Sequence, residues 1–130
     1  MKISQFDDID EVFDHLARER EEADKHVKPW QAALGPGDFF LRIADCGGEP
    51  VVIYGEIFES EYEEDREAHR DPAMKNYRLS RCASEVCPEP EIGDVHVASI
   101  VRQISKDEFD RARKLGWPSS MSGLKSVLGL

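Results

Sequence analysis

The segment from residue 35 to residue 58 constrains the fold more than any other part of this chain, because it is the most apolar. Side chains over residues 39–44 alternate in the period of a strand with one buried face. Residues 45–50, Asp-Cys-Gly-Gly-Glu-Pro, are typical of a tight turn, and residues 51–58 are apolar on both faces. Gly55 interrupts this second run and predicts a bulge or a bend. The segment therefore predicts two antiparallel strands, the second buried on both sides.

Helical patterns lie on both sides of this predicted hairpin. A capping-box pattern and apolar residues at helical spacing predict a helix over residues 8–26, which Pro29 prevents from continuing. Near the other end, Ser105 and Glu108 form a second capping box. Arg111, Arg113 and Lys114 follow, and basic residues in the last turns of a helix stabilise its C-terminus. We therefore expect a second helix over residues 105–115.

The remaining segments complete an α+β prediction for a single domain spanning residues 1–130. Residues 77–83 and 94–104 are the third and fourth strands, and an acidic excursion over residues 59–76 precedes them. An apolar tail, residues 119–130, ends the chain. Because strands and helices do not alternate, we predict a four-stranded, mostly antiparallel curved sheet between an N-terminal helix and a helix near the C-terminus. A half-open barrel is the alternative form of this sheet.

Charge narrows the classes of partner that the chain can bind. Its 27 acidic residues against 17 Lys and Arg residues give a net charge of −10, with the strongest excess of acids between Glu56 and Asp71. Such a chain repels phosphates, so we expect a basic protein partner and no nucleic acid. No apolar run reaches the roughly 20 residues that a membrane span needs. The absence of a secretory signal and the three cysteines predict a cytoplasmic protein with reduced thiols.

Four polar residues within the predicted strands are the best candidates for a catalytic site. Glu56 interrupts an apolar strand close to Tyr54, while Arg78 and His96 lie in the third and fourth strands. Carboxylates and imidazoles are the common general acids and bases, so these four residues on one sheet face would suit a small hydrolase. Antiparallel sheets commonly leave one face in water, however, and solvated polar side chains are the simpler interpretation.

The cysteines are weaker candidates for a metal site. Cys46, Cys82 and Cys87, with His96 or His69, would supply the ligands of a Cys₃His zinc site. Four residues separate Cys82 from Cys87, which is wider than the usual zinc pair, and no second pair follows. Buried cysteine is also common as a small apolar side chain. We therefore expect no metal and no cofactor.

Function is predicted here by exclusion more than by signature. No Walker-type loop, Gly-x-Gly-x-x-Gly, His-Glu-x-x-His or Gly-x-Ser-x-Gly motif occurs in the chain. The acidic excursion and the apolar tail favour a small binding module of the accessory, regulatory or inhibitor-like kind over an enzyme. The alternative is the small hydrolase described above. A homodimer joined through residues 124–130 is compatible with either function.

Overall fold

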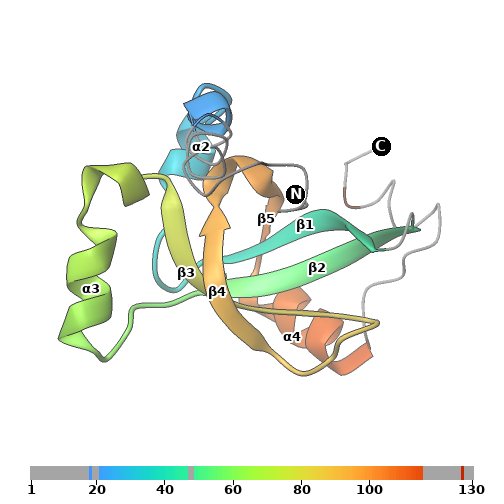
Figure 1. The fold of residues 1–130 in the computed structure, drawn as a ribbon. Helices are drawn as coiled ribbons and strands as arrows, with labels where there is room; N and C mark the ends of the chain where they lie inside the picture. Colours follow the sequence, from blue (N-terminus) through green and yellow to red (C-terminus); the bar gives the residue numbers. More distant parts are fainter. Residues whose placement is uncertain (1–17, 19–20, 47–48, 116–126, 128–130) are drawn as a thin grey trace, which may run out of the picture.

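The computed structural model describes residues 18, 21–46, 49–115 and 127, and for residues 45, 46 and 49 it describes the backbone alone. These residues form an α+β fold around one open sheet of five antiparallel strands in the order β4-β3-β2-β1-β5 (Figure 1). No helix in the described part of the chain is long and apolar enough to cross a membrane.

The elements follow one another closely along the chain. The strands are β1 Phe39–Cys46, β2 Glu49–Ile57, β3 Tyr77–Ser84, β4 Glu91–His96 and β5 Ile100–Ile104. The helices are α2 Pro29–Ala32, α3 Glu63–His69 and α4 Lys106–Leu115, with short 3₁₀ turns η2 Pro72–Met74 and η3 Val97–Ser99. Before α2, Arg18 and residues 21–24 are helical, and the rest of the helix predicted over residues 8–26 lies outside the described residues.

The predicted hairpin is confirmed, and β2 lies between β1 and β3 with both of its faces buried. A tight turn precedes it, in which Gly37 has a φ of 94°, a value that favours glycine. The Asp38 amide donates to the Gly35 carbonyl at 3.0 Å, and the Gly35 amide donates to the Asp38 carboxylate at 2.8 Å. The aspartate thus fixes the chain immediately before β1.

Of the bulge or bend predicted at Gly55, the bulge is wrong. Pairing runs without a shift through this residue on both sides, opposite Phe40 on β1 and opposite Cys82 on β3. Glycine is needed here because a Cβ atom would lie 2.6 Å from Phe40 Cζ and 2.9 Å from Cys82 Sγ. The register shift in the sheet lies instead between Leu41 and Arg42, where β1 pairs with β5.

The prediction of four strands is also wrong, because the segment predicted as the fourth strand is two strands. β4 and β5 lie at opposite edges of the sheet, joined only by η3. The break follows from His96, whose Nδ1 accepts a hydrogen bond from the Ala98 amide at 3.1 Å and so turns the chain. Because three residues connect the two edges, the sheet must curve until the edges approach each other at η3.

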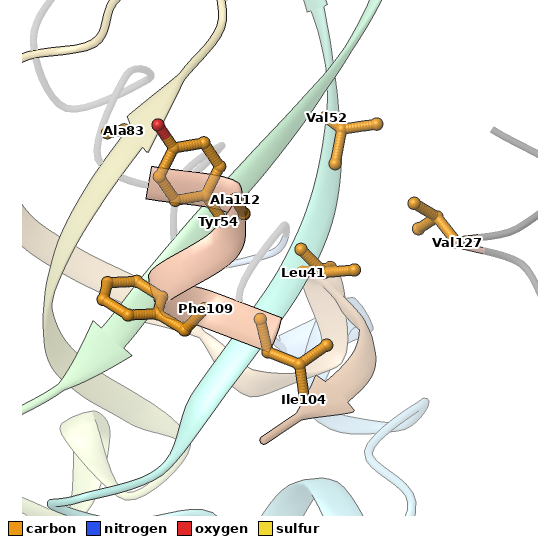
Figure 2. Close-up of a cluster of buried hydrophobic side chains, with 8 residues drawn as sticks. All are labelled: Leu41, Val52, Tyr54, Ala83, Ile104, Phe109, Ala112 and Val127. Carbon is orange, nitrogen blue, oxygen red and sulfur yellow. The ribbon is translucent and has the colours of Figure 1, made fainter. Parts of the chain in front are cut away.

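Apolar side chains form a separate cluster on each face of the sheet. On one face, Phe109 and Ala112 of α4 pack against Tyr54 and neighbouring residues of β1, β2 and β5 (Figure 2). The predicted C-terminal helix is thus confirmed, with the Ser105 hydroxyl accepting from the Glu108 amide at 3.1 Å. On the opposite face, the cluster consists of Leu34, Phe40, Ile57, Val95, Val97 and Ile100.

The predicted apolar tail is described only at Val127. This residue is helical and 1% exposed, and it belongs to the cluster beneath α4 (Figure 2). At this position the tail therefore packs on its own chain. The other residues of the segment 119–130, and the residues directly after α4, lie outside the described residues.

Candidate functional site

Helix α3 carries both exposed acids and bases that line a cleft. Glu63, Glu64 and Glu67 lie on one side of the helix at the helical period of 3.6 residues per turn, and they are exposed. Arg66 and His69 line a cleft against the sheet, and Arg66 also pairs with Glu63 at 2.6 Å. None of the residues of α3 is buried. The helix stands at the side of the sheet beyond β3 (Figure 1), so its outer face is open to a partner.

Polar contacts rather than apolar packing hold this helix in place. Arg66 donates from Nη1 to the carbonyl oxygens of Ser60 and Glu61 at 3.1 and 3.3 Å. The Ser60 hydroxyl donates to the Asp65 carboxylate at 2.7 Å and accepts from the Tyr62 amide at 3.1 Å. Bonds of this kind restrain the helix without covering its outer carboxylates.

His69 ties α3 to the edge strand β4. Its Nδ1 lies 2.7 Å from the Asp65 carbonyl oxygen, and its Nε2 lies 2.6 Å from Asp94 Oδ1. Both partners can only accept, so both ring nitrogens must carry a proton and the ring is an imidazolium. The pKa of His69 is accordingly raised, first by the bond to the Asp65 carbonyl and then by the bond to Asp94, while burial opposes both.

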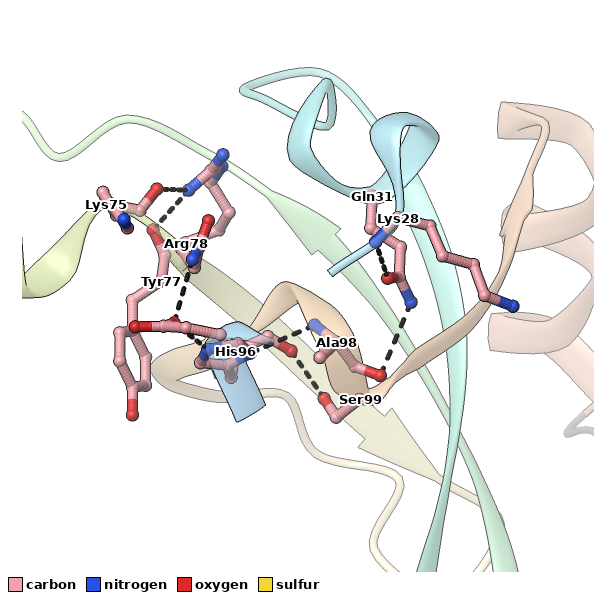
Figure 3. A network of polar contacts seen from close by, with 10 residues as sticks. Lys28, Gln31, Lys75, Tyr77, Arg78, His96, Ala98 and Ser99 are labelled. Carbon is pink, nitrogen blue, oxygen red and sulfur yellow. Dashed lines mark hydrogen bonds and ion pairs between the residues drawn. The ribbon is translucent and has the colours of Figure 1, made fainter. Parts of the chain in front are cut away.

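The cleft behind α3 has a volume of about 330 Å³ and is bounded by α3, η2, β3 and the end of β2. Its apolar lining includes Ile57, Met74 and Leu79, and its basic lining includes Arg66, Lys75 and Arg78. Among these, Arg78 donates to the carbonyl oxygens of Lys75 and Tyr77 (Figure 3). It also donates to those of Leu34 and Ala32. Arg78 therefore fixes the chain around α2 to the beginning of β3.

The four residues proposed for a hydrolase lie in three different places. Tyr54 and Glu56 share a cavity of about 140 Å³ next to α4, where Glu56 pairs with Arg81 at 3.5 Å. Burial raises the pKa of Tyr54. Arg81 is the residue of β3 that lies opposite Glu56. Because faces alternate along a strand and three residues separate the two arginines, Arg78 points to the other face of the sheet. His96 lines neither that cavity nor the α3 cleft.

His96 belongs instead to a network at the end of β4 (Figure 3). Its Nε2 donates to Asp24 Oδ1 at 2.8 Å, and the same oxygen accepts from Asn76 Nδ2 at 2.9 Å. These two bonds, that of Asn76 first, lower the pKa of Asp24. Because Nδ1 accepts from the Ala98 amide, the ring is the neutral tautomer protonated at Nε2. Neither nitrogen has a lone pair available to a substrate.

The described cysteines belong to no cluster of three metal ligands among the described residues, and the Cys87 thiol is not activated. Cys82 and Cys87 both line a cavity of about 100 Å³ that includes Glu91. The negative charges of Glu91 and, more weakly, Glu89 raise the pKa of the Cys87 thiol, together with burial. This is the opposite of what a nucleophile needs. Within the described residues no three His, Cys, Asp or Glu side chains gather as ligands, and the Cys46 side chain lies outside them.

Sequence reasoning found the acidic segment but missed the cleft behind it. Arg66 and Arg70 follow Glu63 by three and seven residues, so helical spacing predicts that they lie beside Glu63, and both arginines pair with it. The contact of His69 with Asp94 had no such signal, because 25 residues separate them. Comparisons with protein-family models, curated proteins and solved structures found no match to this chain.

Proposed function

We propose that this protein is a binding module of the accessory or regulatory kind, inhibitor-like in action, which docks a basic protein through the outer face of α3. The observation that carries the proposal is the combination of exposed carboxylates with a helix that contributes no buried residue. The carboxylates of Glu61, Glu64 and Glu67, here called the outer glutamates, form no hydrogen bond or ion pair with the described residues. Their charges are therefore available to a partner.

Electrostatic docking also suits the way in which α3 is held. A helix fixed by Arg66 and His69 from its inner side presents a defined arrangement of carboxylates rather than a flexible acidic loop. Complementary charge speeds association and selects basic partners over acidic ones. His69 and His96 each use both ring nitrogens in hydrogen bonds within the chain. Because neither ring has a nitrogen left for a substrate, these positions favour binding over acid–base catalysis.

The proposed homodimer is a separate part of this hypothesis. Val127 packs within its own chain, so a dimer through residues 124–130 would have to use other side chains of that segment. Sedimentation equilibrium of the whole protein tests this: a single monomer mass across a concentration series would overturn the homodimer and leave the docking proposal in place.

The docking proposal is tested with a fluorescent deca-lysine peptide as the basic probe, by anisotropy at low and at physiological salt. Replacing the three outer glutamates by Gln should weaken binding substantially, and the loss should shrink as salt screens the charges. The matched control replaces Glu85, Glu89 and Glu91 by Gln in the exposed β3–β4 segment. It removes the same net charge from another place, so it should have a smaller effect.

Equal effects of the two triple variants would overturn the proposal, because attraction would then depend on net charge alone. The melting temperature is the control for folding. It should change little in the outer-glutamate variant, since exposed charges without partners contribute little to stability. A large loss of stability would show instead that these carboxylates have a structural role.

A further inference from the structure

The cleft behind α3 is basic although the chain as a whole is acidic. Five cationic side chains line it, namely Arg66, His69, Arg70, Lys75 and Arg78, and the carboxylates in its lining are Glu59 and Asp65. Three of the five cations also have ion pairs at its edge, because Glu63 pairs with Arg66 and Arg70, and Asp94 pairs with His69. Asp65 already accepts a bond from Ser60. The excess of positive charge in the cleft therefore comes from Lys75, Arg78 and the exposed Arg70.

Several of these cations have no full counter-charge within the described residues. Arg78 bonds only to backbone carbonyl oxygens, which satisfy its donors but not its charge (Figure 3). Lys75 makes no side-chain bond or ion pair, and the nearby Asp24 is already bonded to Asn76 and His96. Arg70 is 68% exposed and lies 3.5 Å from the Glu63 carboxylate. An anion in the cleft would balance this charge.

The surface beneath the cations is apolar. Ile57, Met74, Tyr77 and Leu79 contribute to it, and Ile57 also belongs to the cluster on that face of the sheet. The volume of about 330 Å³ lies at the lower end of the range for small-molecule sites, about 300–1,000 Å³. A bare inorganic anion would leave this apolar surface in water.

We propose that the cleft is a binding site for a small organic carboxylate with an apolar body. The carboxylate contacts Lys75 and Arg70, and the apolar body lies on Met74 and Leu79. The site is separate from the docking face, because Lys75 and Arg70 pair with none of the outer glutamates. A ligand bound there would bridge α3 and β3.

Octanoate is the probe, titrated into the isotope-labelled whole protein and followed by the amide resonances of residues 57, 77 and 79. Saturable shifts at these amides are expected. Lys75→Gln and Arg70→Gln should each weaken binding about two- to fivefold, the value of a partly exposed ion pair. The control is Lys106→Gln on α4, whose ammonium is bonded to Asp110 and which should leave binding unchanged.

Further probes separate charge from apolar burial. Octylammonium, with the same chain and the opposite charge, should bind much more weakly than octanoate, and inorganic phosphate should also bind weakly. Shifts confined to other parts of the sheet, equal binding of octylammonium, or no shift at millimolar octanoate would each overturn the inference. The Gln variant of the outer glutamates should keep octanoate binding, so the failure of the docking proposal would be seen separately.

Discussion

Gly55 offers the sharpest test of how the centre of the sheet is built. An alanine Cβ at this position would lie 2.6 Å from Phe40 Cζ, 2.9 Å from Cys82 Sγ and 3.0 Å from the Arg81 carbonyl oxygen. The third neighbour is backbone in a paired strand, and Phe40 is fully buried, so the neighbours have little room to move. We therefore expect Gly55→Ala to destabilise the protein.

Two opposing contributions set the size of this effect. Overpacking of a tight core costs about 1–3 kcal/mol, whereas replacing glycine by alanine in a strand recovers roughly 0.5–1 kcal/mol of chain entropy. Gly93 provides the matched control, because it is also in a strand, its φ is not positive and a Cβ there meets nothing within 4 Å. The entropy contribution is common to both variants, so their difference of about 1–3 kcal/mol isolates the overpacking.

Urea denaturation of the parent protein, Gly55→Ala and Gly93→Ala measures how much each substitution changes the free energy of unfolding, provided that the m-values agree. A double variant then identifies the contact responsible. Phe40→Leu removes the ring atom nearest to the new Cβ, so it should cost less in the Gly55→Ala background than alone. If Gly55→Ala were as stable as Gly93→Ala, the close approach would not be the reason for glycine in this strand.

Two further predictions concern the polar contacts that hold the cleft. Because the folded pKa of His69 is raised, its contribution to stability should be complete below its unfolded pKa of about 6.5 and lost as the pH rises through the folded value. His69→Ala should therefore cost more free energy of unfolding at about pH 5.5 than at about pH 9, and an equal cost at both would contradict the imidazolium assignment. Arg78→Lys should destabilise the protein by about 1–3 kcal/mol, because bonds to carbonyl oxygens are lost. The same change at the exposed Arg81 is the control and should cost under about 1 kcal/mol. Equal losses of the free energy of unfolding in denaturant titrations would refute the anchoring role of Arg78.

Local patterns in the sequence predicted the elements whose formation is local. The hairpin follows from alternation and turn residues within a single segment, and α4 follows from Ser105 and Glu108, three residues apart. The split of the predicted fourth strand depends on how the His96 side chain turns back onto the Ala98 amide. A strand-forming sequence such as Val-His-Val-Ala-Ser-Ile carries no sign of that choice.

The candidate site shows the same limit. Tyr54 and Glu56 share a face because they are two residues apart on one strand, which the sequence predicts. Whether Arg78 joins them depends on the register between β2 and β3, and that register places Arg81 opposite Glu56. A shift of one residue would have reversed the result. Candidate sites assembled across strands therefore require the register before they can be assessed.

The two faces of α3 also explain why a seven-residue helix that buries nothing can be maintained. An isolated helix of this length is unstable in water, so its order must come from contacts with the rest of the chain. Those contacts come from Asp65, Arg66 and His69, all of which line the cleft. Mutations that weaken them should therefore disturb the cleft and the outer glutamates together, whereas mutations of the outer glutamates should leave the cleft intact. Comparing the two kinds of mutation therefore distinguishes the binding surface, the outer glutamates, from the contacts that hold α3 in place.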